Sequence, residues 1–127
     1  MRSVNKVVLM GHLAADPEAK VTQKGQNLAR FRVAIHRDWQ GSDGEHHEAT
    51  DFHKIVAWRK LGEVCALYLK KGSPVYLEGK IMNHHYEGKD GKDHLTTEIV
   101  ADVVNFISYK KNKEGGEIQL QEVSTEA

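Results

Sequence analysis

One segment of the chain has the period of a helix, and the segments on both sides of it have the period of strands. In residues 60–72, four apolar side chains follow the i, i+3, i+4, i+7 spacing of one helix face: Leu61, Val64, Cys65 and Tyr68. Gly72 suits the left-handed residue that ends a helix, and Pro74 begins a new extended segment. The pattern predicts one short amphipathic helix in a chain of strands.

Five other segments have the composition or alternation of strands. Residues 28–39 alternate most clearly, because Phe31, Val33 and Ile35 lie on one side and arginines on the other. Turn-forming residues separate the segments. Residues 15–27 are predicted to form a loop or an irregular hairpin connection, and residues 40–48 a loop, and Asp90-Gly91 is a strong tight-turn signal. The remaining strands are predicted at residues 4–13, 50–58, 74–86 and 94–107.

The order of these elements is strand-strand-strand-helix-strand-strand. This order predicts an all-β protein with one short helix, arranged as a five-stranded oligonucleotide/oligosaccharide-binding (OB) barrel. We expect residues 1–109 to form one OB-fold domain, and residues 110–127 to form a flexible C-terminal tail without periodicity.

Charge and composition narrow the choice of function. The chain has 18 Lys and Arg against 18 Asp and Glu, so an anion-binding face requires local segregation of charge. No apolar run reaches the roughly 18 residues that cross a bilayer, and the N-terminus is typical of a strand rather than of a signal peptide. These features favour a cytoplasmic protein with no membrane partner.

Aromatic and basic side chains occur together on the predicted strands. On residues 50–58, one side carries Phe52, Lys54, Val56 and Trp58, which leaves Ile55 and Ala57 as inward positions. Single-stranded nucleic acid requires this combination, since every base offers a π-face and every linker a negative charge. The stacking candidates are Trp39, Phe52, Trp58 and Tyr86. The phosphate candidates are Arg30, Arg32, Arg37, Lys54, Lys80 and Lys89. The alternative for each aromatic is a place in the core.

Other chemistries are not favoured. Adjacent histidines in "EHHE" and "NHHY" point to opposite faces of a strand, and a lone Cys65 cannot build a zinc site, so we expect no metal. The chain has no phosphate-cradling glycine loop and no nucleophile elbow, so we expect neither an enzyme nor a cofactor. Cys65 lies on the apolar helix face, where a buried thiol is expected.

Three segments closely resemble bacterial-type single-stranded DNA-binding protein (SSB): "VNKVVLMGHLAADPE", "DFHKIVAWRKLGEVCALYLKKGSPVYLEGK" and "TTEIVADVVNF". The resemblance implies an OB barrel that assembles as a homotetramer and binds single-stranded DNA with little sequence preference during replication, recombination and repair. It implies the same four stacking aromatics, and it implies a place for His53 near the subunit interface.

The sequence departs from the SSB pattern at three places. The family commonly has Trp at the positions of Phe52 and Tyr86, and Phe at that of Trp58. Met82, His84 and His85 stand where the family usually has more basic residues. Because the reference pKa of a histidine side chain is about 6.5, we expect DNA binding to tighten as the pH falls and the histidines become protonated. Members of the family usually end in an acidic tip that closes with Pro-Phe and recruits repair and replication proteins, and the C-terminal "QLQEVSTEA" has no such tip. Recruitment of those proteins is therefore doubtful. The ending is consistent with a truncated chain or with a phage or plasmid variant.

Two other functions remain open on the sequence. One is a primosome-type OB protein, a short dimeric relative that lacks the acidic tip. The other is an OB module that acts as a protein-interaction scaffold, with its aromatics buried at subunit contacts. Binding of oligo-dT separates the scaffold from the DNA-binding readings.

Overall fold

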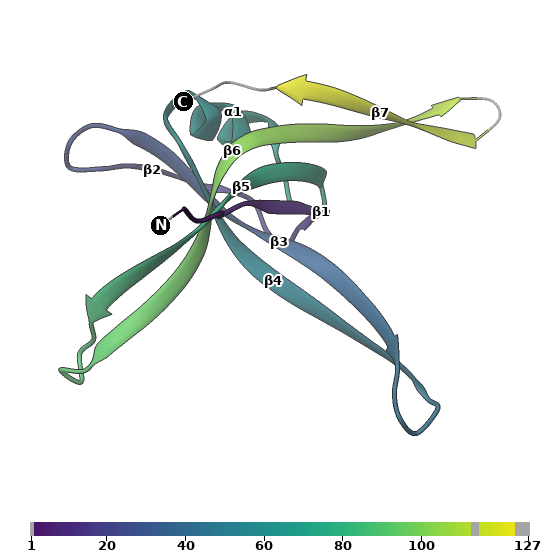
Figure 1. The fold of residues 1–127 in the computed structure, drawn as a ribbon. Helices are drawn as coiled ribbons and strands as arrows, with labels where there is room; N and C mark the ends of the chain where they lie inside the picture. The colour runs from purple at the N-terminus through teal and green to yellow at the C-terminus, as the bar shows by residue number, and fades with distance from the viewer. Residues whose placement is uncertain (1, 113–114, 124–127) are drawn as a thin grey trace.

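The computed structural model describes the backbone of residues 2–112 and 115–123, and side chains through Ile107. Seven strands and one helix follow in the order β1 (Val7–Leu13), β2 (Glu18–Val21), β3 (Asn27–Gln40), β4 (His46–Trp58), α1 (Arg59–Tyr68), β5 (Pro74–Glu87), β6 (Asp93–Asn112) and β7 (Gly115–Val123). Figure 1 shows α1 at one end of the molecule, with the β3–β4 and β5–β6 hairpins pointing away from it.

Five of the strands form a closed barrel, as the sequence predicts. They are hydrogen-bonded in the order β1-β5-β6-β4-β3, and β3 returns to β1 through the pairs His12–Ala34 and Leu13–Val33. The β4–β6 pairing is parallel and joins Ile55 to Ile99, whereas the other pairings are antiparallel. The helix lies between β4 and β5 in the chain, which completes the expected OB topology.

Inward side chains of all five barrel strands make one apolar core. Ile55 and Ala57 of β4 are buried in it, on the side of the strand that the alternation predicts. The helix closes one end of the barrel with Leu61 and Cys65. Gly62 allows this close approach, because a Cβ there would clash with the backbone of Ala57. Cys65 belongs to this core, as the sequence predicts, and its burial raises the pKa of its thiol to about 12.

Several boundaries differ from the sequence prediction. The polar segment 15–27 contains β2, which pairs with β3 as one strand of a hairpin. The helix ends at Tyr68, because Leu69 is extended and buried; Gly72, with φ 87°, lies in the following turn. Residues 110–112 continue β6, and β7 pairs with it, so the expected tail contains paired strands in its described part. Residues 113–114 and 124–127 lie outside the described residues.

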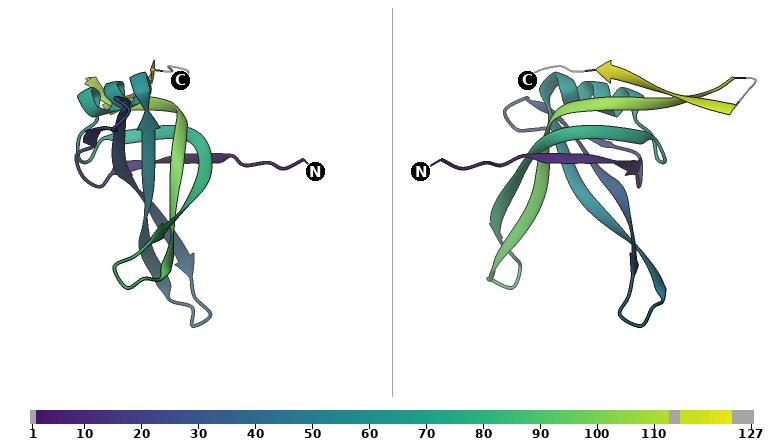
Figure 2. Two further views of the ribbon diagram at one scale, coloured as in Figure 1. Left: turned by 90° about the vertical axis from the view of Figure 1, so that its left-hand side faces the viewer. Right: turned by 45° about the vertical axis from the view of Figure 1, so that its right-hand side comes forward.

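Two hairpins extend beyond the barrel as separate arms (Figure 2). The first arm is the outer part of β3 and β4, residues 36–50, and the second is the outer part of β5 and β6, residues 80–96. The sequence placed residues 40–48 in a loop, but β4 already begins at His46. Most side chains of both arms are exposed, so cross-strand hydrogen bonds rather than core burial hold them together.

Candidate nucleic-acid interface

The outer side of β4 carries the predicted aromatic and basic residues. Phe52 is 58% exposed, Lys54 is exposed and Trp58 is half-buried at the junction with α1. Val56 lies on the same side but is fully buried, between Arg30 of β3 and Val100 of β6. The outer face of β4 is therefore open to a ligand at Phe52 and Lys54 and covered further along the strand.

Three of the predicted phosphate contacts lie together. Arg30, Arg32 and Lys54 line a surface hollow of about 390 Å³ between β3, β4 and β6. Arg32 and Lys54 are directly opposite each other across the two strands. Among the described side chains, none of these three cations forms a salt bridge.

The same hollow contains acidic side chains that already have partners. Glu98 contacts Nε2 of His84 at 2.6 Å, and Glu18 lies 3.7 Å from Lys20. Asp16 accepts a hydrogen bond from the backbone N–H of Lys71 at 2.8 Å. Each of these acids has a partner of its own, whereas none of the three cations forms a salt bridge among the described side chains, so the cations can bind an anion in the hollow.

Trp39 and Arg37 lie on the opposite face of the first arm from Phe52. The uninterrupted pairing of β3 with β4 places Trp39 opposite His47, and Phe52 opposite Ala34. Because successive residues alternate between faces, Trp39 shares its face with Asp51 rather than with Phe52. The four predicted aromatics therefore do not form one continuous surface within this chain.

Arg37 is engaged by two neighbouring groups. Its guanidinium forms a two-pronged ion pair with the carboxylate of Asp51, with Nη2 to Oδ1 at 3.3 Å. The same guanidinium lies 5.2 Å from the ring centroid of Trp39. Arg37 is thus less free to bind a phosphate than the three cations of the hollow, and it holds the indole in place.

The second arm carries the remaining candidates. Tyr86 is 53% exposed, and Lys80 lies on the same side of β5, where Met82 is 41% exposed between them. Lys89 is exposed in the turn that joins β5 to β6. These side chains are accessible, but they lie on the second arm, whereas Phe52 and Lys54 lie on the barrel part of β4.

His53 lies on the other side of β4 from Phe52. It is half-buried and opposite Val33, next to the core position Ile55. The structure describes a single chain, so the predicted place of His53 at a subunit interface stays a prediction.

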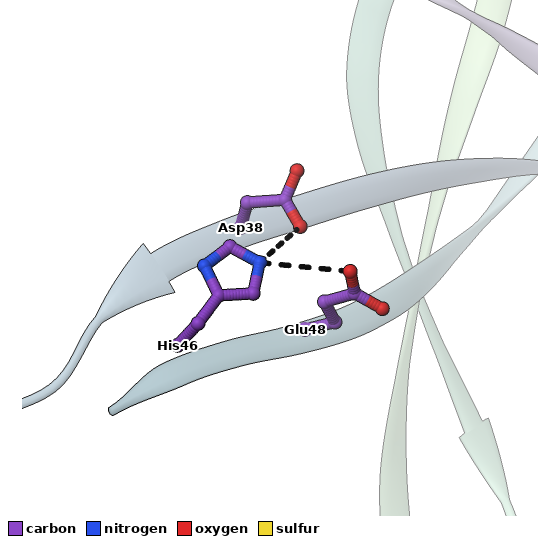
Figure 3. Close-up of side chains that lie close together, drawn as sticks. All are labelled: Asp38, His46 and Glu48. Atoms are coloured by element: carbon purple, nitrogen blue, oxygen red, sulfur yellow. Dashed lines mark ion pairs between the residues drawn. The ribbon is translucent and has the colours of Figure 1, made fainter.

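One cluster of possible metal ligands was not expected from the sequence. Nε2 of His46 lies 3.5 Å from a carboxylate oxygen of Asp38 and 3.5 Å from one of Glu48 (Figure 3). The sequence placed His46 in a loop, and the cross-strand pairing of Asp38 with Glu48 brings the three together. All three side chains are exposed, and clusters of exposed groups of this kind are common without a metal ion.

Two histidines that the sequence analysis did not assign contact the predicted aromatics. His47 stacks on Trp39 with ring centroids 5.5 Å apart, and His94 stacks on Tyr86 at 5.3 Å. A signal for both was present in the sequence, because each aromatic is followed at the same spacing by Gly, Asp-Gly and His.

A closed OB barrel with exposed aromatics and unpaired cations on its outer strands defines an oligonucleotide-binding class of protein. Comparison with known families agrees, because residues 4–107 match the Single-strand binding protein family. The chain belongs to this family, which is one of DNA-binding proteins rather than enzymes.

Individual relatives and structures support the family assignment. The chain is 40% identical over 114 residues to the single-stranded DNA-binding protein of Neisseria meningitidis serogroup B, covering 90% of this chain and 66% of that protein. It is 42% identical over 113 residues to single-stranded DNA-binding protein 3 of Listeria innocua, covering 89% and 69%. The chain thus spans about two thirds of the length of these curated relatives.

A solved structure has the same fold. The Plasmodium falciparum SSB in complex with single-stranded DNA superposes with a TM-score of 0.77 at 26% identity, covering 85% of this chain and 98% of that one. Among the described residues, no helix is long and apolar enough to span a membrane.

Proposed function

We propose that this chain binds single-stranded DNA without strong sequence preference and protects it during replication, recombination and repair. The observation that carries the proposal is the exposed Phe52 beside Lys54 and Arg32 on the outer face of the barrel, two cations that form no salt bridge among the described side chains. A base can stack on the ring while the following phosphate enters the hollow between the cations. The names of the bacterial relatives state the same ligand for those proteins.

Stacking and charge contribute differently to this binding. Stacking on an aromatic side chain is worth about 1–3 kcal/mol per base and does not depend on base identity. The contacts of Arg30, Arg32 and Lys54 to phosphates weaken as salt rises, because they release condensed counterions. We therefore assign the salt-resistant part of the affinity to the aromatics and the salt-sensitive part to the hollow.

The remaining predicted contact residues extend the path of the DNA over the protein. Tyr86, Lys80 and Lys89 provide a second stacking and phosphate surface on the second arm. Trp39 provides a third surface on the far face of the first arm. We propose that the DNA contacts these surfaces in succession as it wraps around the protein, rather than lying in a single groove.

We further propose that the chain assembles as a homotetramer. The outer side of β1 leaves Val8 52% exposed and Met10 59% exposed, which is apolar surface that a second copy can cover. Several copies would present their surfaces to one strand at high effective concentration. Sedimentation equilibrium measures the mass directly, and a dimer would favour the primosome-type alternative.

We place the activity in the bacterial cytoplasm, where single strands arise during replication. The relatives named above are bacterial proteins, and a gene of chromosomal, phage or plasmid origin would act in the same compartment.

A titration with oligo-dT tests the proposal. The two tryptophans should be quenched as DNA binds, and Phe52→Ala should weaken binding by about fivefold or more. Tyr68→Ala is the matched control, because it removes an aromatic side chain that is 67% exposed on α1, away from the proposed path. Absence of binding at low salt would refute DNA binding and would favour the scaffold alternative.

A further inference from the structure

The ends of the two arms are built to the same plan. The first tip, residues 39–47, and the second tip, residues 86–94, share the sequence pattern aromatic-x-Gly-x-Asp-Gly-x-x-His. In both, the aromatic on one strand is directly opposite the histidine on the next, as Trp39–His47 and Tyr86–His94. Two unrelated hairpins would not need the same residue at four matching positions and an aromatic residue at a fifth.

The backbone of the two turns is also the same. In the first tip, the N–H of Gly41 donates to the carbonyl of Glu45 at 2.9 Å, and the N–H of Gly44 donates to that of Gly41 at 3.0 Å. In the second tip, the equivalent bonds of Gly88 and Gly91 have the same lengths, 2.9 and 3.0 Å. The second glycine of each pair has a left-handed φ, 80° and 75°, which favours glycine there.

The aspartate of each tip connects the turn to the histidine. Oδ1 of Asp43 accepts the backbone N–H of Glu45 at 3.0 Å and lies 3.5 Å from Nε2 of His47. Oδ1 of Asp90 accepts the N–H of Lys92 at 3.0 Å and lies 3.1 Å from Nε2 of His94. The backbone bond from Lys92, and then the bond to His94, hold the pKa of Asp90 below its ordinary value, which keeps the carboxylate charged.

The histidine in turn covers one side of the aromatic ring. The Trp39–His47 and Tyr86–His94 ring planes are inclined by only 21° and 22°. The aromatic side chains nevertheless stay 43% and 53% exposed. The first glycine of each tip makes room for this contact, because a Cβ on Gly41 or Gly88 would lie within 3 Å of the aspartate and the histidine.

We infer that each tip is a positioning device, in which the aspartate holds the histidine and the histidine ring holds the aromatic in the orientation that stacks on a base. This inference rests on the proposed function. A free aromatic on an exposed hairpin must give up rotamer freedom when a base binds, and a braced one has already done so. His47 and His94 are thus positioning residues for binding at two separate places on the DNA path.

The test compares each stacked histidine with an adjacent exposed residue of the same strand. His47→Ala and His94→Ala should each weaken binding of a long oligo-dT by about threefold, and the double variant by about tenfold. The controls His46→Ala and Leu95→Ala remove exposed side chains next to His47 on β4 and next to His94 on β6; neither stacks on either ring among the described contacts, and both variants should bind as the unmodified protein does. Unchanged or tighter binding of the His47 and His94 variants would overturn the inference, as would an equal loss in the controls.

A rescue variant separates positioning from folding. His47→Phe keeps a ring on Trp39 but not the contact to Asp43, so it should retain most of the affinity that His47→Ala loses. In a Trp58→Phe background Trp39 is the single tryptophan, and its near-ultraviolet circular dichroism should diminish in His47→Ala and persist in His47→Phe. Equal weakening of both variants would refute the role of the stacked ring.

The proposed function is tested independently by Phe52→Ala, which lies outside both tips. If the unmodified protein binds and Phe52→Ala weakens it while the histidine variants do not, only the role of the tips is wrong. If the unmodified protein does not bind oligo-dT, the proposed function itself is wrong.

Discussion

Arg32 in β3 and Lys54 in β4 lie directly opposite each other on the outer face of the barrel, and neither forms a salt bridge among the described side chains. Like charges at opposite positions of a sheet repel and destabilise the pair. A phosphate bound between them would relieve that repulsion. The arrangement thus lowers the stability of the free protein locally and favours occupation of the hollow by an anion.

Lys54→Gln should separate stability from binding. We expect its melting temperature at low salt to equal or exceed that of the unmodified protein, because the repulsion from Arg32 is removed. Its affinity for oligo-dT should fall, and the slope of log K against log salt should decrease by about 0.7, the value for one single-strand phosphate contact. Lys60→Gln, an exposed change on α1, should alter neither quantity. A lower melting temperature with an unchanged salt slope would contradict the assignment.

Phe52→Ala and Trp58→Ala should behave differently. Phe52 is 58% exposed, so its removal should change the free energy of unfolding by less than about 0.5 kcal/mol. Trp58 is half-buried at the strand–helix junction, so its removal should lower both stability and affinity. Urea unfolding combined with oligo-dT titration measures both effects, and Trp58→Phe should restore most of each. Unfolding of Phe52→Ala would show that this side chain belongs to the core.

The contribution of Trp39 should depend on the length of the DNA. Because Trp39 and Phe52 face opposite sides of the first arm, a short strand cannot contact both within one chain. Phe52→Ala should therefore weaken binding of oligo-dT of all lengths. Trp39→Ala should have little effect on the shortest oligonucleotides that bind, about 4–8 nucleotides, and a clear effect on longer ones. Equal losses at every length would indicate that one continuous surface binds the DNA.

Cys65 predicts a specific loss of stability at high pH. The folded thiol has a pKa of about 12 because of burial, against 9.0 for a free thiol. As pH rises, the unfolded chain therefore loses the thiol proton before the folded chain does. The contribution of the protonated Cys65 to the free energy of unfolding is complete below pH 9 and is lost progressively between pH 9 and 12. Melting curves from pH 7 to 11 should show a steeper decline for the unmodified protein than for Cys65→Ala. Rapid alkylation of native protein by iodoacetamide at pH 8 would be inconsistent with the buried thiol.

The sequence by itself determined the order of the elements, the barrel class and the two sides of β4. The alternation around Ile55 and Ala57 was sufficient, because a buried face needs apolar residues at every second position. The same alternation predicted that Phe52 and Lys54 lie on the outer side of β4, where both are exposed. Strand β2 and the start of β4 at His46 were missed, because polar, exposed strands have no such alternation.

Only the tertiary structure decided which side chains meet. The register of β3 against β4 set Arg32 opposite Lys54 and put Trp39 on the far face from Phe52, and neither relationship can be read from one strand alone. Likewise, pairing across the two turns brought His47 onto Trp39 and His94 onto Tyr86. The periodicity of a strand specifies its faces, but cross-strand hydrogen bonds specify its neighbours, and the candidate site depends on the neighbours.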